Sequence, residues 1–120
     1  MGYTTEFDGS IELAPPLSLT QFKQLESFAA AQHEGGFPGY YCQWVPNSDG
    51  TALVWDGGEK FYNASEWMQY LIDHFIEPWG IKADGVINAE GEDHGDTWRL
   101  HVDDNEVSVT RAKITWDSVR

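Results

Sequence analysis

The sequence is poor in cysteine: its 120 residues include only one, Cys42. An internal disulfide is therefore impossible, whereas small secreted domains usually depend on several. No apolar run approaches the ~20 residues that span a bilayer, and the first ten residues lack the basic and apolar regions of a secretory signal. These absences predict a single soluble domain over residues 1–120, located in the cytoplasm and without a membrane partner.

Basic residues are also scarce. Lys and Arg number 7 against 20 Asp and Glu, which gives a net charge of -13. Proteins that bind nucleic acid or anionic membranes usually present a broad basic face to them. The composition therefore argues against direct binding of this chain to DNA or RNA.

Metal-binding and catalytic motifs are missing as well. There are no paired cysteines, no His-Glu-x-x-His motif and no twelve-residue calcium loop. His94 and His101 have aspartates nearby, but acidic turns are common for solvation reasons, so we predict neither a metal nor a cofactor. His74, on the apolar stripe of a predicted helix, and Cys42 have no catalytic partner beside them in the sequence. This favours a partly buried structural histidine and a buried, inert thiol.

Hydrophobic periodicity predicts the helices and the first strand. Residues 3–13 alternate between apolar and polar, as in a half-buried strand. Ser18 is a good N-cap for a helix that ends before Gly35. Asn63 opens a second helix, and Glu66 is placed to complete a capping box with it.

The remaining strands are short segments rich in β-branched and aromatic residues. They are predicted at 40–45, 51–55, 81–90, 97–102 and 106–110, with 113–116 as a weaker candidate. The resulting order is β-α-β-β-α-β-β-β. It favours an α+β, two-layer domain in which both helices cover one face of an antiparallel sheet.

Residues 40–55 contain a concentration of aromatic side chains. Alternation in the first strand of this hairpin places Tyr40 and Trp44 on one face and Tyr41 on the other, and Trp55 lies on the second strand. A sheet covered by helices on one side requires only one apolar face. Because both faces carry aromatics, we expect some of them at an exposed binding surface.

Two runs in this region, CQWVP from Cys42 and WDGGEKFY from Trp55, resemble the most distinctive motifs of a family of small acidic proteins of tailed phages and prophages. The resemblance extends through EWMQYLIDHFIEPWG to about Lys113. This chain has only HEGGFPGYY where many relatives carry a longer Pro- and Gly-rich segment. The family is mostly uncharacterised, and the resemblance implies a phage-type accessory protein in the host cytoplasm, acting in counter-defence by binding.

On this basis we predict a non-enzymatic homo-oligomer that sequesters a nucleotide-derived immune signal of the host in an aromatic pocket. Such a pocket needs aromatic planes for a base and cations for phosphates. The expected ligand-binding residues are Tyr41, Trp44, Trp55, Lys60, Arg99 and Arg111.

Two alternatives remain open. Residues 84–106 hold eight carboxylates against the single Arg99, so the chain is also a candidate decoy that occupies a basic surface of a host protein, as a nucleic-acid mimic does. The expected contact residues of the decoy are Glu90, Glu92, Asp93 and Asp96. The simpler interpretation of this region is a solvated acidic rim. The second alternative is a small enzyme acting on a nucleotide-like ligand, although no nucleophile, base and orienting group can be placed together.

Overall fold

The computed structural model describes residues 4–93 and 95–112, so His94 and the candidate strand at 113–116 lie outside the described residues. Within them, the expected α+β class and element order are confirmed. The strands are β1 (Thr5–Ala14), β2 (Trp44–Pro46), β3 (Ala52–Trp55), β4 (Lys82–Gly91), β5 (Thr97–Asp103) and β6 (Glu106–Arg111). The helices are α1 (Leu19–Ala30) and α2 (Ala64–Leu71), and α2 continues into a π-helical turn, η1 (Ile72–Ile76).

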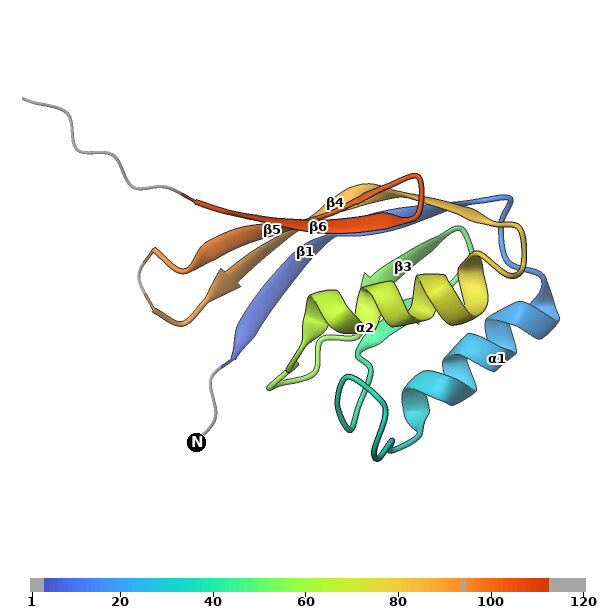
Figure 1. Cartoon of the computed structure of the whole chain (residues 1–120), viewed down its shortest axis with the longest axis horizontal. Coiled ribbons are helices and arrows are strands. Elements are labelled where there is room, and N and C mark those ends of the chain that lie inside the picture. The colour runs from blue at the N-terminus through green and yellow to red at the C-terminus, as the bar shows by residue number, and fades with distance from the viewer. Residues whose placement is uncertain (1–3, 94, 113–120) are drawn as a thin grey trace, which may run out of the picture.

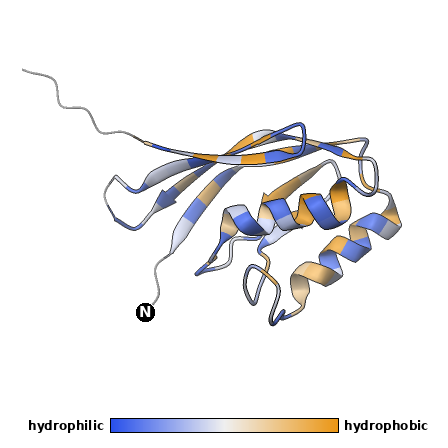
Figure 2. Cartoon of the chain, in the orientation of Figure 1, coloured by the Kyte–Doolittle hydropathy of each residue, from blue (hydrophilic) through white to orange (hydrophobic). Residues whose placement is uncertain are grey.

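The six strands form one antiparallel sheet in the order β2-β3-β1-β4-β5-β6, and the helices lie against one of its faces (Figure 1). The longest ladder joins β1 to β4, from Thr5 opposite Gly91 to Ala14 opposite Lys82. Hydrophilic and hydrophobic residues alternate along the strands (Figure 2). Because successive side chains point to opposite faces, this register decides which residues reach the core and which face solvent.

Strand β1 follows the predicted alternation. Phe7, Ile11 and Leu13 are buried, and the polar residues between them point to the open face. Gly9 interrupts the series with φ +122, and a Cβ at this position would lie 2.6 Å from the Val86 carbonyl oxygen. Glycine is required there because β1 and β4 approach each other too closely for any side chain.

The two helices begin in different ways. Ser18 caps α1 by accepting a hydrogen bond from the Gln21 amide at 3.2 Å, and the Gln21 side chain accepts one from the Ser18 amide at 2.9 Å. Asn63 is left-handed, with φ 59, and makes no cap hydrogen bond; its side-chain amide donates to the Pro38 carbonyl instead. The capping box predicted for Asn63 and Glu66 is therefore wrong, because Asn63 ties the start of α2 to a neighbouring loop.

The second helix buries a face that only partly follows α-helical spacing. Leu71 is buried at the end of α2, and Ile72 and Ile76 continue the buried face through η1. The i→i+5 hydrogen bonds of a π turn change the angular spacing of side chains. His74, expected to be partly buried, is exposed for this reason, and its ring stacks on Tyr70 with 4.1 Å between centroids.

The β6 edge of the sheet is partly closed by α2. Gln69 Oε1 accepts a hydrogen bond from the Val107 amide at 3.2 Å, while Gln69 Nε2 donates to Asp73 Oδ1 at 2.8 Å. Edge strands expose unpaired N–H groups that invite association, and Gln69 satisfies one of them. The β5–β6 turn itself is made by Asp104 and Asn105, both left-handed, with φ 48 and 69. None of the helices in residues 4–93 and 95–112 is long and apolar enough to cross a membrane.

Candidate functional site

The two tryptophans of residues 40–55 belong to the core. Trp44 is 1% exposed, its indole N–H donates to the Ala64 carbonyl at 2.8 Å, and its ring lies 5.1 Å from that of Phe7. Trp55 is half-buried and also packs on Phe7, at 5.4 Å. Strand pairing sets Trp44 opposite Trp55, so both rings lie on the same side of the sheet as Phe7. This corrects the expectation that Trp44 contacts a ligand.

Three tyrosines that flank the hairpin are exposed instead. The predicted strand 40–45 is shorter than expected, because β2 begins only at Trp44 and the residues before it are irregular. Tyr40, Tyr41 and Tyr62 are 63%, 53% and 60% exposed. They surround one cavity of about 480 Å³, here called the tyrosine cavity. Its lining consists of Gly39, Tyr40, Tyr41, Gln43, Glu59, Lys60, Tyr62 and Asn63.

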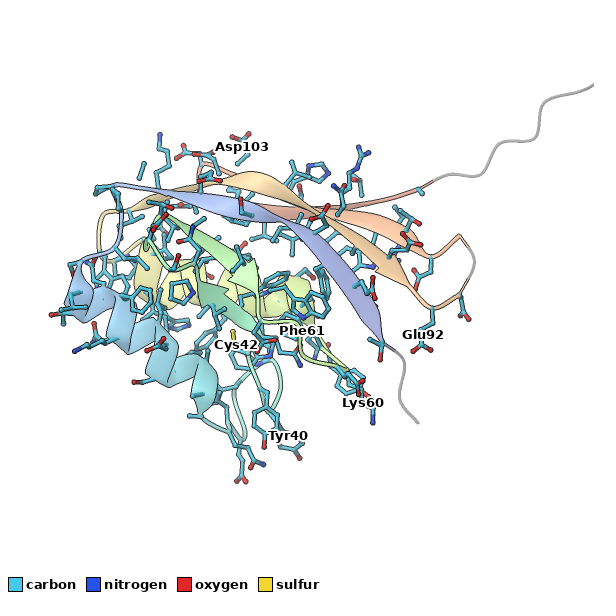
Figure 3. All side chains as sticks on the ribbon, turned by 180° about the vertical axis from the view of Figure 1, so that it is seen from behind. Tyr40, Cys42, Lys60, Phe61, Glu92 and Asp103 are labelled. Atoms are coloured by element: carbon cyan, nitrogen blue, oxygen red, sulfur yellow. The ribbon has the colours of Figure 1, made fainter. Side chains whose placement is uncertain are left out.

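The segment between β3 and α2 is anchored at its centre and exposed on either side. Phe61 is buried, with its ring 5.1 Å from that of Trp44, whereas Lys60 and Tyr62 are exposed. Figure 3 shows Phe61 beneath the sheet and Lys60 farther from it. Lys60 and Asn63 have φ 57 and 59, left-handed values that are costly for residues with a side chain. The packing of Phe61 holds this strained backbone in place and so displays its neighbours at the cavity.

Hydrogen bonds join the two loops that form the tyrosine cavity. Gln43 Nε2 donates to the Glu59 carbonyl at 2.9 Å, and Gln43 Oε1 accepts from Trp55 Nε1 at 3.0 Å. The bond from Asn63 to the Pro38 carbonyl adds a second connection. The cavity is thus formed within one chain, and its walls are held by bonds that need no ligand.

The charge at the tyrosine cavity is nearly balanced. Lys60 is the one cation and Glu59 the one carboxylate among the lining residues. Neither ion pair found within residues 4–93 and 95–112 involves Lys60. The ammonium group of Lys60 is therefore free to meet an anionic group of a ligand.

A buried donor lies directly behind the cavity wall. Trp67 Nε1 has no hydrogen-bond partner within the described part of the chain. A Cβ built on Gly39 would lie 3.2 Å from Trp67 Nε1 and 4.0 Å from Asn63 Nδ2, and both Gly39 and Asn63 line the cavity. The indole N–H thus lies directly against Gly39, and a larger residue there would have to displace the ring or the loop.

The chain matches no protein-family model, no curated protein and no solved structure. Tyr41 and Lys60 line the tyrosine cavity. Trp55 stands behind its wall, hydrogen-bonded to the lining residue Gln43.

Arg99 and Arg111 line a different and smaller cavity, of about 220 Å³, on β5 and β6. Arg111 Cζ lies 5.9 Å from the ring centroid of Trp98, and Arg111 Nη1 lies 3.5 Å from Asp96 Oδ1. Arg99 Nε donates to Asn88 Oδ1 at 3.0 Å. The expectation that these arginines join the aromatic pocket is corrected, because β5 and β6 hold them away from the two loops that build it.

The predicted ligand-binding residues did not include six of the residues that line the cavity: Gly39, Tyr40, Gln43, Glu59, Tyr62 and Asn63. Tyr40 was assigned to a strand, although the preceding Pro38 and Gly39 favour irregular backbone. The sequence also contained a signal for Tyr62, since it follows the apolar residue Phe61 directly. Adjacent residues on an extended segment point in opposite directions.

The open face of the sheet gathers carboxylates from four strands. Glu12 lies opposite Asp84, Asp103 lies opposite Glu106, and continuation of the β4–β5 register places Asp84 beside Asp103. Directly opposed side chains on a sheet are roughly 4.5–5.5 Å apart, and like charges at this spacing repel. We call these four residues the acidic row; the face of the sheet that carries it bears no helix (Figure 1).

The residues predicted for a decoy surface lie elsewhere on the same sheet. Glu90 is on the open face, opposite Glu6, whereas Glu92, Asp93 and Asp96 lie around the β4–β5 turn. Figure 3 shows Glu92 at this end of the sheet and Asp103 of the acidic row far from it. The carboxylates predicted for the decoy thus lie at or near the β4–β5 turn, whereas the acidic row crosses β1, β4, β5 and β6.

Cys42 is a buried thiol with a raised pKa. Burial raises the pKa of the Cys42 thiol from 9.0 to about 12, and repulsion from the Asp56 carboxylate acts in the same direction. Such a thiol is protonated at neutral pH, and the expected burial of Cys42 is confirmed. Within the described residues, no group of three or more His, Cys, Asp or Glu side chains is placed to hold a metal ion. His94, part of the weak candidate with His101, lies outside these residues.

Proposed function

We propose that this chain is a non-enzymatic binding protein whose tyrosine cavity captures a small, nucleotide-like molecule. In the phage-type setting implied by the sequence resemblance, the captured molecule is a nucleotide-derived immune signal of the host. The observation that carries the proposal is the grouping of three exposed tyrosines and Lys60, which joins neither ion pair of the described residues, around one preformed cavity.

The lining residues suit a planar ligand with an anionic group. Tyrosine rings stack on flat heterocycles and also offer hydroxyl groups for hydrogen bonds. The volume of about 480 Å³ lies within the range of ~300–1,000 Å³ typical of small-molecule sites. Lys60 supplies a cation for a phosphate, and the side-chain amide of Gln43 lies at the wall for polar edges.

Two observations support binding rather than catalysis. Burial raises the pKa of the Cys42 thiol to about 12, which suppresses the reactive thiolate at neutral pH far below the small fraction formed by an ordinary thiol. The buried His33 is hydrogen-bonded through Nε2 to the Phe28 carbonyl at 2.8 Å and packs between aromatic rings. Among the described residues, the hydrogen-bond partners of Cys42 and His33 are backbone carbonyls, not the base or nucleophile that covalent or acid–base catalysis needs.

The proposal is tested by recovering the ligand. The protein is purified from infected cells and heated, and the released small molecules are identified by mass spectrometry. We expect an intact nucleotide-like molecule from the wild type and little from a Tyr40→Ala/Tyr62→Ala variant. Leu19→Ala removes a side chain that is 70% exposed on α1, away from the cavity lining, and should behave as wild type.

Two results would count against the proposal. Equal recovery from the wild type and the double tyrosine variant excludes the tyrosine cavity as the binding site. Release of a chemically altered product favours the enzyme alternative.

The acidic row favours a second candidate function, that of a decoy for a basic surface of a host protein. Four aligned carboxylates repel one another, so a cationic partner that neutralises them gains electrostatic energy. Pull-down from host lysate at low and high salt tests this function. Glu12→Gln/Asp103→Asn should lose a salt-sensitive partner, whereas Glu26→Gln/Glu34→Gln, which removes the same charge elsewhere, should keep it. A partner retained equally by both variants would exclude the acidic row as its binding surface.

A further inference from the structure

The tyrosine cavity has a limited capacity for negative charge. Among its lining residues, Lys60 is the one cation and Glu59 the one carboxylate. Arg99 and Arg111 line a separate cavity and are engaged with Asn88 and Asp96. The side chains of the cavity wall therefore carry no net positive charge.

The rest of the protein repels anions as well. The net charge of the chain is -13, so the field outside the cavity opposes the approach of a polyanion. A phosphomonoester carries about -1.5 to -2 charges at neutral pH, and each additional phosphate adds further repulsion. The single ammonium group of Lys60 can offset the charge of one phosphate at close range. The cavity lining has no second cation to offset the charge of another phosphate.

We propose that the tyrosine cavity selects ligands that carry a single phosphate group and discriminates against those with two or more. This inference rests on the proposed function, because it concerns the ligand of the same cavity. It narrows the ligand class to nucleoside monophosphates and cyclic mononucleotides. The tyrosines hold the base, Lys60 holds the phosphate, and Glu59 with the surrounding negative field rejects additional phosphates.

Isothermal titration at constant ionic strength tests the inference. The probes are the four common ribonucleosides, their 3′,5′-cyclic monophosphates, and their 5′-mono-, di- and triphosphates. For at least one base, we expect a monophosphate or cyclic monophosphate to bind more tightly than the nucleoside, and the di- and triphosphates to bind roughly tenfold or more weakly than the monophosphate.

Two lysine variants separate the local charge from the net charge. Lys60→Met keeps most of the aliphatic stem and should remove the advantage of the monophosphate over the nucleoside. Lys82→Met changes the net charge by the same amount, but Lys82 pairs with Asp104 at 3.4 Å and does not line the cavity. It should leave every affinity within about twofold of wild type, because exposed ion pairs contribute little. Glu59→Gln should reduce the discrimination against diphosphates.

The outcomes distinguish this inference from the proposed function. If none of these probes binds, the single-phosphate inference is wrong, and the proposed function is decided by the recovery of ligand from infected cells. If a di- or triphosphate binds more tightly than the monophosphate of the same base, and the tyrosine variant loses that binding, the proposed function stands and the single-phosphate inference is wrong. Equal effects of Lys60→Met and Lys82→Met would also overturn the inference, because the selectivity would then come from net charge.

Discussion

Tyr40 and Trp44 are four residues apart on one segment, yet one is 63% exposed and the other 1% exposed. Trp44 is the first residue of β2, and pairing with Trp55 directs its ring into the core. Tyr40 precedes the strand, and its carbonyl accepts a hydrogen bond from the His33 amide at 2.7 Å. The difference shows that aromatic content alone does not locate a binding surface; the point at which strand pairing begins does.

The comparison also assigns different physical roles to the two residue types. The rings of Trp44 and Phe61 pack together in the core and so fix the loop that displays Lys60 and Tyr62. The tyrosines make few of the contacts that hold the fold and keep their rings available. A rigid aromatic support beneath an exposed aromatic surface favours binding, because ordering the surface then costs little entropy.

The largest effect expected is on stability and separates Trp44 from Tyr40. Trp44→Ala should lower the free energy of unfolding by about 3–5 kcal/mol, because it leaves a cavity and removes the indole hydrogen bond to Ala64. Tyr40→Ala should change it by less than about 0.5 kcal/mol, because the side chain is mostly exposed. Urea denaturation followed by tryptophan fluorescence measures both values. Similar losses of stability in the two variants would mean that Trp44 and Tyr40 do not differ in their contribution to the core.

Cys42 lies between the exposed Tyr40 and the buried Trp44 in the sequence, and its titration gives the second prediction. Its pKa is about 12 in the folded protein against 9.0 for an ordinary thiol. The unfolded state therefore releases this proton first as the pH rises. The contribution of Cys42 to stability is fully present below pH 9 and is lost between about pH 9 and 12, by about 1.4 kcal/mol per pH unit.

Other groups titrate in the same range, so the prediction is a difference between two proteins. Denaturant unfolding across this pH range should show a steeper loss of stability in the wild type than in Cys42→Ala. Iodoacetamide at mildly alkaline pH should label Cys42 only after unfolding. Rapid labelling of the native protein would show that the Cys42 thiol is accessible to solvent and would contradict this prediction.

The fold could be predicted because its determinants are local. Alternation in β1, the Ser18 cap and the turn residues before Glu106 each act within a few residues, and the α+β order followed from them. The start of β2 and the π turn of η1 were not predicted. Both depend on how a segment packs against distant elements, and the apolar pattern alone does not record this.

The candidate site was only partly predictable for the same reason. Tyr41 and Lys60 were expected at the binding surface on chemical grounds, and both line the cavity. The hydrogen bonds that build the cavity join residues 16 and 25 positions apart, from Gln43 to Glu59 and from Asn63 to Pro38. Pairings over such separations leave no periodic signal in a single sequence.

Gln43 connects the buried side of the hairpin to the exposed side, and its replacement gives the third prediction. Gln43→Leu removes the acceptor of Trp55 Nε1 and the donor to the Glu59 carbonyl. We expect a loss of about 1–2 kcal/mol in the free energy of unfolding, because Trp55 is half-buried and its N–H loses its partner.

Tyr41→Phe provides a matched control for Gln43→Leu. It removes one hydrogen bond between exposed side chains, from the Tyr41 hydroxyl to Gln32 Oε1 at 3.3 Å, and should cost less than about 0.5 kcal/mol. Both values come from urea denaturation. An equal effect of the two substitutions would mean that Gln43 does not couple the cavity wall to the core.

The smallest effect concerns Gly39, where the exposed wall meets the buried Trp67. Gly39→Ala places a Cβ 3.2 Å from Trp67 Nε1, closer than most real contacts, and we expect a loss of about 0.5–1 kcal/mol in the free energy of unfolding. Gly39→Ser adds the same Cβ together with a hydroxyl that can accept a hydrogen bond from the unpaired Nε1–H. The serine variant should therefore be more stable than the alanine variant, by urea denaturation under identical conditions. If serine is equal to or less stable than alanine, the Trp67 N–H does not reach the space beside residue 39, and the core and the cavity wall are not in contact at this point.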